Sequence, residues 1–136
     1  MNEAIQVAVL PQRYTALAPD GSEIRELIAL GGGSMAHCTL PVAGVSAAVR
    51  HRTVEEIWYV LRGRGQLWGR RDHREEVVDL APGVSVAIAQ GMHFQFRNTS
   101  DEPLTFLLVT MPPWPGAEEA VRVEDHWPPF LARPGA

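Results

Sequence analysis

The sequence contains no lysine, and all 12 of its basic residues are arginine. The 16 acidic residues outnumber them, so the formal net charge is −4 and the isoelectric point is about 5.7. A chain of this charge has no positive field that would attract nucleic acid or an anionic membrane surface. We therefore expect neither of these partners.

Cysteine and long apolar runs are also scarce. The single cysteine, Cys38, cannot form an intramolecular disulfide, and it excludes a zinc site built from several cysteines. The longest stretch without charge, residues 27–49, contains three consecutive glycines and Pro41, so it is too weakly apolar for a membrane helix. The first residues include an early acid and no basic segment, unlike a signal peptide. These absences predict a cytoplasmic protein.

The remaining composition is that of an ordinary globular protein, with 136 residues, 46% of them hydrophobic and 21% charged. This length predicts one domain over residues 1–136. Short runs of alternating or β-branched residues, separated by glycine and proline, predict about eight to ten strands in an all-β sandwich or small barrel. Residues 23–30 fit a strand or a short helix. The clearest strand candidates are 5–10, 35–40, 57–61, 66–68, 76–80, 84–89, 93–97 and 104–111.

The composition changes after Met111, because six of the 11 prolines lie between Pro112 and Pro134. We expect a core barrel over about residues 23–111, followed by a proline-rich C-terminal tail over 112–136. This tail would lie across the barrel as a strap, with Trp114 and Trp127 as anchors. Within it, residues 118–124 fit one short helical turn or an edge strand.

The residues best suited to chemistry begin with His51, which precedes Glu56 at the entry to an apolar strand. Strand alternation must point either Glu55 or Glu56 inward, and we favour Glu56. A buried carboxylate is costly unless it is paired or binds a metal. His93, from a distant strand, would complete a site of two histidines and one carboxylate, a set that suits a first-row divalent metal with open coordination positions.

The segments around these residues resemble the two conserved motifs of the cupins. In the first motif a pair of histidines precedes a glutamate, and a glycine follows after six residues, as Gly63 follows Glu56. His51 matches the second histidine of the pair. Three structural positions of the second motif are also in register: Gly83, Gly91 and Asn98. The resemblance implies a cupin-type double-stranded β-helix, a jelly-roll barrel of two antiparallel sheets with a pocket at one end.

The chain departs from the cupin motifs at two ligand positions. Val49 stands where the first motif has its first histidine, and Phe94 replaces the histidine of the second motif, with His93 one position earlier. A shift of one residue reverses the direction of a strand side chain, so a regular strand would put Phe94 and Phe96 on one face and His93 on the other. A bulge near Met92 would instead turn His93 inward. The metal hypothesis depends on such a bulge.

Two functions remain open at this point. The first is a small metalloprotein with one divalent transition metal (Fe, Mn, Ni, Zn or Cu) held by His51, Glu56 and His93. The cupin resemblance implies a dioxygenase, isomerase or epimerase, decarboxylase or cyclase acting on a small organic molecule, with Glu56 and His51 as catalytic residues. The alternative is a metal-free binding protein, in which Glu56 and His51 hydrogen-bond the ligand or act as an acid–base pair.

Either function needs a small-molecule pocket within the barrel. We expect its lining to include His37, Trp58, Phe94, Gln95, Phe96 and Phe106. His37 could supply the ligand missing at Val49, although a hydrogen-bonded histidine in the barrel wall is the favoured interpretation. Edge strands must be covered, and cupins are often dimers, so we also expect a homodimer.

Overall fold

The computed structural model describes residues 4–131. Over this range the chain is almost entirely β-structure, with one short 3₁₀ turn, η1. The elements are β1 (Ala16–Leu17), β2 (Glu23–Leu30), β3 (Gly33–Leu40), β4 (Val49–His51), β5 (Glu55–Arg62), β6 (Gly65–Arg71), β7 (Arg74–Leu80), β8 (Ser85–Ile88), β9 (His93–Asn98), β10 (Leu104–Met111), η1 (Ala117–Glu119) and β11 (Ala120–Arg122).

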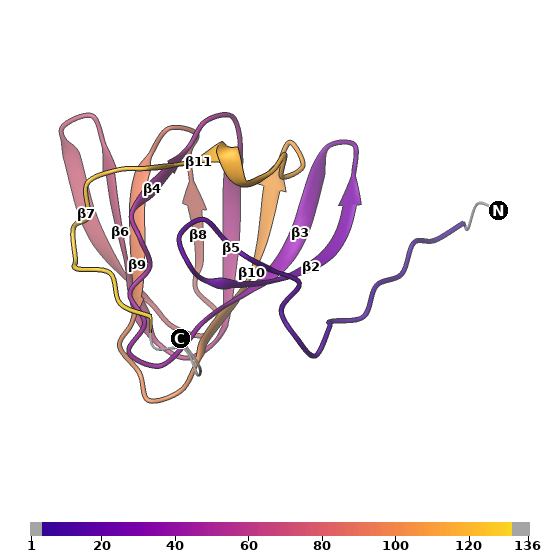
Figure 1. Ribbon diagram of the computed structural model, residues 1–136, viewed down its shortest axis with the longest axis horizontal. Helices are drawn as coiled ribbons and strands as arrows, with labels where there is room; N and C mark the ends of the chain where they lie inside the picture. Colours follow the sequence, from indigo (N-terminus) through magenta and orange to yellow (C-terminus); the bar gives the residue numbers. More distant parts are fainter. Residues whose placement is uncertain (1–3, 132–136) are drawn as a thin grey trace.

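The strands form two antiparallel sheets that face each other across the core (Figure 1). Sheet A has the order β1-β2-β3-β10-β5-β8, and sheet B has the order β11-β4-β9-β6-β7. Strands that are distant in sequence become neighbours in both sheets, as β3, β10 and β5 do in sheet A. This is the predicted jelly-roll barrel, and residues 23–30 form a strand in it.

An aromatic cluster fills the space between the sheets. Strand alternation turns Trp58 of β5, Phe94 and Phe96 of β9, and Phe106 of β10 inward, where all four are buried. The rings of Trp58 and Phe106 stack with centroids 4.0 Å apart, and Phe96 meets both rings edge-on. Such pairs add to the stabilisation that burial alone provides.

Two residues of the conserved motifs hold the loops at one end of the barrel. Gly63 has a φ of 79°, and a Cβ atom there would lie 2.6 Å from the carbonyl oxygen of Pro103, so glycine is required. The Asn98 side-chain amide donates hydrogen bonds to three backbone carbonyls, those of Leu40, Pro41 and Glu102. The motif positions that predicted the fold therefore have a direct structural role.

The C-terminal segment, residues 112–131, is called the strap below. It passes the cavity at Pro113 and Trp114, pairs with β4 as β11, and then runs along the outer face of sheet B, where Trp127 meets Gln95 (Figure 1). Both structures considered for residues 118–124 form there, since η1 leads directly into the edge strand β11. Residues 132–136, the end of the predicted tail, lie outside the described residues. Within residues 4–131 no helix has the length and apolar character that a membrane span needs.

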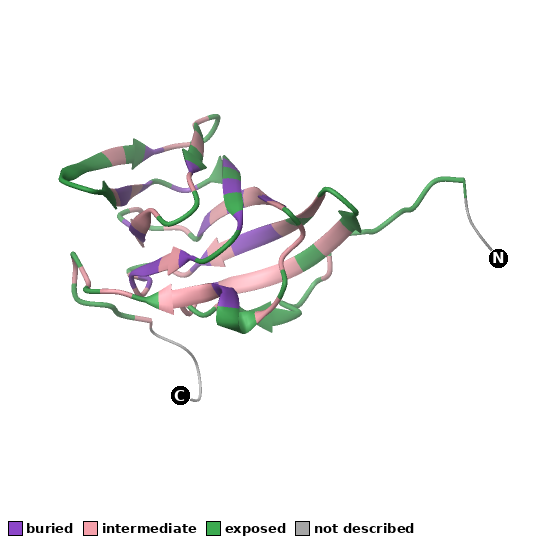
Figure 2. Ribbon diagram, turned by 90° about the horizontal axis from the view of Figure 1, so that it is seen from above, coloured by how far each residue is buried: buried purple, intermediate pink, exposed green. Residues whose placement is uncertain are grey.

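The N-terminal segment does not form the strand predicted for residues 5–10. It runs away from the barrel in an extended conformation (Figures 1 and 2). Among the described residues, none pairs with it as a neighbouring strand. The alternating pattern therefore predicted an extended backbone correctly but a strand wrongly, because a strand also needs a partner.

Candidate functional site

A cavity of about 340 Å³ lies between the sheets and opens beside β2 and the strap. Most of its wall is apolar, with the aromatic cluster on one side and Trp114 of the strap on another. Five titratable residues also line it: Asp20, Glu26, Cys38, His51 and Glu56. An enclosed apolar space with a few polar groups is the usual form of a small-molecule site.

Glu56 is the most deeply buried acid of the cavity wall. Glu55 points outward on β5 and is exposed, whereas the Glu56 side chain points inward and Glu56 is only 5% exposed. Its Oε1 atom accepts a hydrogen bond of 2.5 Å from Nε1 of Trp58. Burial raises the pKa of Glu56 to about 7, and nearby Asp20 raises it further, while the Trp58 hydrogen bond opposes the shift.

His51 faces Glu56 from β4, with its Nδ1 atom 3.6 Å from Oε2 of the glutamate. His51 is 4% exposed, and Nδ1 has no hydrogen-bond partner in the described part of the chain. The rings of Phe94 and Trp114 lie edge-on to the imidazole, each at a centroid distance of 5.2 Å. Burial lowers the pKa of His51 to about 4, although the charge of Glu119 opposes this.

These two pKa values decide the charge state of the pair. Between about pH 4 and pH 7 the His51 imidazole is neutral and the Glu56 carboxyl is protonated. The 3.6 Å contact is therefore a meeting of two uncharged groups and not an ion pair. One group can donate a proton and the other can accept one, and both are held in a water-poor space.

Asp20 is a second acid of the cavity wall, which the sequence interpretation missed. It lies in the turn between β1 and β2, where its Oδ1 atom accepts hydrogen bonds from the backbone N–H and the hydroxyl of Ser22. Burial raises the pKa of Asp20 despite these bonds. An aspartate in an Asp-Gly-Ser segment looks like ordinary turn chemistry, so no signal in the sequence pointed to the cavity.

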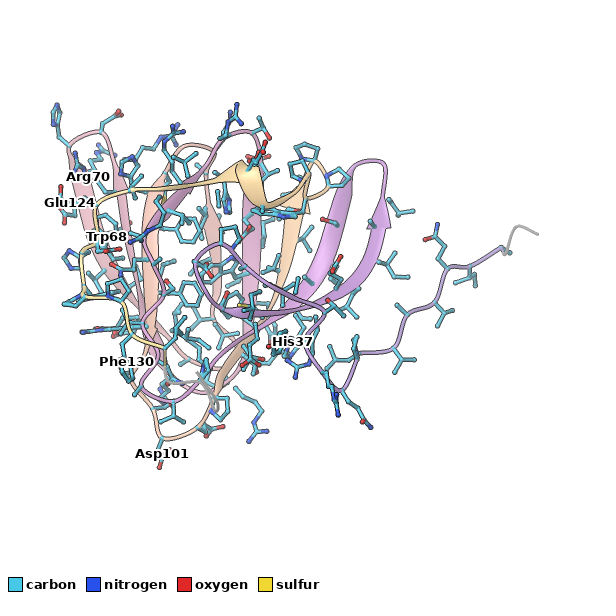
Figure 3. The ribbon with its side chains drawn as sticks, in the orientation of Figure 1. His37, Trp68, Arg70, Asp101, Glu124 and Phe130 are labelled. Atoms are coloured by element: carbon cyan, nitrogen blue, oxygen red, sulfur yellow. The ribbon has the colours of Figure 1, made fainter. Side chains whose placement is uncertain are left out.

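His93 lies away from the cavity, contrary to the expected metal site. The β9 ladder runs in register, with His93 opposite Arg70 and Phe94 opposite Val49, and without a bulge. Phe94 therefore points inward, and His93 lies outside in a polar groove with Arg70 and Arg71 (Figure 3 labels Arg70). Over residues 4–131 no group of three histidine, cysteine or acidic side chains is close enough to hold a metal ion.

Two predicted pocket residues are also absent from the cavity wall, whereas Trp58, Phe94, Phe96 and Phe106 do line it. Gln95 faces the strap from the outer side of sheet B, because it alternates with Phe94 and Phe96. His37 lies on the outer face of sheet A opposite Arg25 (Figure 3). Burial and the Arg25 charge lower the pKa of His37.

Comparison with known families gives the motif resemblance independent support. A family model described as "Cupin domain" matches residues 36–110, which is more than half of the chain. The chain belongs to the cupin family. A curated relative of this cupin is the uncharacterized protein MJ1618 of Methanocaldococcus jannaschii, which is 28% identical over 119 residues and aligns with 81% of this chain and 92% of the relative.

Solved structures show the same fold at low sequence identity. BH2720 from Bacillus halodurans is 20% identical to this cupin, with a TM-score of 0.61 over 73% of this chain and 76% of the other. A predicted oxalate decarboxylase from Thermotoga maritima is 22% identical, with a TM-score of 0.58 over 67% of this chain and 80% of the other. CapF from Staphylococcus aureus, a capsular polysaccharide assembling protein, is 16% identical, with a TM-score of 0.67 over 76% of this chain and 32% of CapF.

Cupins often bind a metal ion, so the donor atoms of this cavity must be compared with what a metal requires. First-row divalent ions in proteins take three or four side-chain ligands. Here Val49 and Phe94 occupy two of the motif's ligand positions and provide no donor, which leaves only His51 and Glu56. The nearby hydroxyls of Ser34 and Thr110 are hydrogen-bonded to each other at 2.6 Å. The residues present therefore do not fit a resident metal.

Proposed function

We propose that this cupin binds a compact, flat and largely apolar molecule in its cavity without a metal ion. The Glu56–His51 pair would hydrogen-bond the polar edge of the molecule and exchange protons with it. The observation that carries this proposal is the 3.6 Å contact between a protonatable carboxyl and an imidazole whose Nδ1 is buried without a partner. Buried polar atoms normally have partners, and a ligand would provide the missing one.

The shape and chemistry of the wall support a flat ligand. Three aromatic rings face the cavity that contains Glu56 and His51, and they belong to Trp58, Phe94 and Trp114. Aromatic rings pack well against other flat rings and contribute most of the apolar contact in such sites. The ligand's apolar body would lie against these rings, with its polar edge directed at Glu56 and His51.

The pair is suited to moving a proton from one ligand atom to another. Near neutral pH the protonated Glu56 carboxyl would give its proton to an oxygen of the ligand. The neutral His51 imidazole would take a proton from a neighbouring carbon or oxygen, so the ligand keeps its composition and becomes a tautomer. A general acid works best when its pKa lies near the working pH, and burial brings Glu56 to this range.

Ligand binding by metal-free protein tests the proposal. The probe is β-naphthol, whose binding is followed by calorimetry and by quenching of tryptophan fluorescence, before and after treatment with a chelator. We expect binding to survive chelation and to weaken about tenfold or more in Glu56→Gln, the equivalent of a lost hydrogen bond. Glu55→Gln is the matched control, because Glu55 is exposed on the other side of the same strand.

Three results would overturn this function. They are binding of β-naphthol that disappears on chelation and returns with Fe²⁺ or Mn²⁺, equal losses in Glu56→Gln and Glu55→Gln, and no binding at all. Elemental analysis of the purified protein runs beside these measurements. A stoichiometric transition metal that is lost in His51→Ala would support the metalloprotein instead.

A further inference from the structure

The cavity is lined by three acids, Asp20, Glu26 and Glu56, but by no fixed positive charge. Glu56 comes from β5, and Asp20 comes from the turn between β1 and β2. Among the described residues that line the cavity none is an arginine, and the chain has no lysine. His51 is neutral above about pH 4, so it does not balance the acids near neutral pH.

The acidic groups also shift one another's pKa values across the cavity. Asp20 and Glu56 both raise the pKa of the buried Cys38 thiol, in addition to the larger effect of burial. Asp20 also raises the pKa of Glu56. A further negative charge among these groups would lack a counter-ion and would lose its hydration.

We propose that Asp20 is a specificity-determining residue that, together with Glu56, restricts the cavity to uncharged or cationic ligands and excludes carboxylates. This rests on the function proposed above and narrows its ligand class. The two acids alone would not define a site, but the buried and unpartnered Nδ1 of His51 lies in the same cavity. An amine or a hydroxyl could donate to the acids when they are ionised, whereas a carboxylate has no proton to donate and would be repelled by them.

Three ligands with the same ring and different charges test this selectivity: β-naphthol, β-naphthylmethylamine and β-naphthoate. We expect the alcohol and the amine to bind, and the carboxylate to bind at least about a hundredfold more weakly than the alcohol. Asp20→Asn keeps the Oδ1 acceptor for Ser22 and removes the acid. The ratio of the β-naphthol affinity to the β-naphthoate affinity should therefore fall by about tenfold in this variant. Asp101→Asn, in an exposed loop (Figure 3), should leave the ratio unchanged.

The possible failures are distinguishable. If β-naphthoate binds the native protein as tightly as β-naphthol, the charge selectivity is wrong and the proposed function stands. If Asp20→Asn and Asp101→Asn give the same ratio, Asp20 does not determine the selectivity. If none of the three ligands binds, the proposed function fails and the selectivity fails with it.

Discussion

Gln95 and His51 lie on neighbouring strands of sheet B and are both buried, yet only one of them has all its polar atoms hydrogen-bonded. The Gln95 amide donates to the carbonyls of Ser46 and Trp127, and its oxygen accepts from the N–H groups of His126 and Trp127, all within 2.8 Å. The Nδ1 atom of His51 has no such partner in the described chain.

The two faces of sheet B therefore have different roles: the outer face holds the strap, and the inner face lines the cavity. On the outer face, side-chain contacts hold the strap, including the stacked rings of Trp68 and His126 and the cation–π contact of Arg97 with Trp127. On the inner face, the polar atoms of the cavity are incompletely paired. A fully satisfied polar network stabilises the fold, whereas an incomplete one has capacity left for a ligand.

Replacing Gln95 should have the largest effect on stability. Gln95→Leu fits the volume but leaves two carbonyls and two N–H groups of the strap and its neighbour without partners. Each unpartnered buried group costs about 1–3 kcal/mol, and partial access of water reduces the sum, so we expect a loss of about 4 kcal/mol in the free energy of unfolding. Urea denaturation measures this loss.

Gln90→Leu is the matched control for this experiment. Its side chain is exposed and donates one hydrogen bond, to the carbonyl of Arg52. We expect this variant to change the unfolding free energy by less than about 1 kcal/mol. Equal losses in the two variants would mean that the amide of Gln95 does not hold the strap.

The pH dependence of stability should show the incomplete pairing of the cavity. Burial raises the pKa of Glu56 from its ordinary 4.5 to about 7, so the folded protein holds this proton longer than the unfolded chain does. The stability contribution of Glu56 is therefore present below about pH 4.5 and is lost as the pH rises through 7. His51 has the opposite effect, because its pKa falls from 6.5 to about 4 and its contribution is lost as the pH falls through 4.

Single variants should uncover these two opposing slopes. In His51→Leu only the Glu56 contribution remains, so the unfolding free energy should fall as the pH rises from about 4.5 to 7, by up to about 3 kcal/mol. In Glu56→Gln it should instead rise between about pH 4 and 6.5 by a similar amount. Thermal or urea unfolding across this range measures both. Parallel curves for the two variants would contradict the assigned pKa shifts.

The comparison of faces also explains how far the sequence could predict the molecule. Fold and motif anchors were predictable because Gly63 and Asn98 perform tasks that few other residues can perform. Glu56 was predictable from alternation with Glu55. Alternation also gave two faces for β9, but whether His93 joined the cavity depended on a bulge, which the regular ladder between β6 and β9 excludes.

Other features depend on contacts that no local pattern records. Gln95 was expected in the pocket, but the strap that covers it comes from residues about thirty positions away. Asp20 was overlooked because a turn sequence does not reveal which space the turn borders. The strand predicted for residues 5–10 has no partner within the described chain.

The smallest effect on the unfolding free energy should come from Trp68→Phe on sheet B. Its matched counterpart is Trp58→Phe on sheet A. Each indole N–H donates to a glutamate: Trp58 to Glu56 in the cavity, and Trp68 to Glu75 at 2.9 Å outside. The Glu75 side chain is about half exposed, at 52%, so water replaces the lost donor and the unfolding free energy should change by no more than about 1 kcal/mol. Glu56 is only 5% exposed and the Trp58 hydrogen bond lowers its pKa, so Trp58→Phe should raise the pKa of Glu56 above 7. An NMR titration of the Glu56 carboxyl measures this shift. The pKa of Glu56 should be unchanged in Trp68→Phe. The same titration midpoint in both variants would show that the indole of Trp58 does not control the pKa of Glu56.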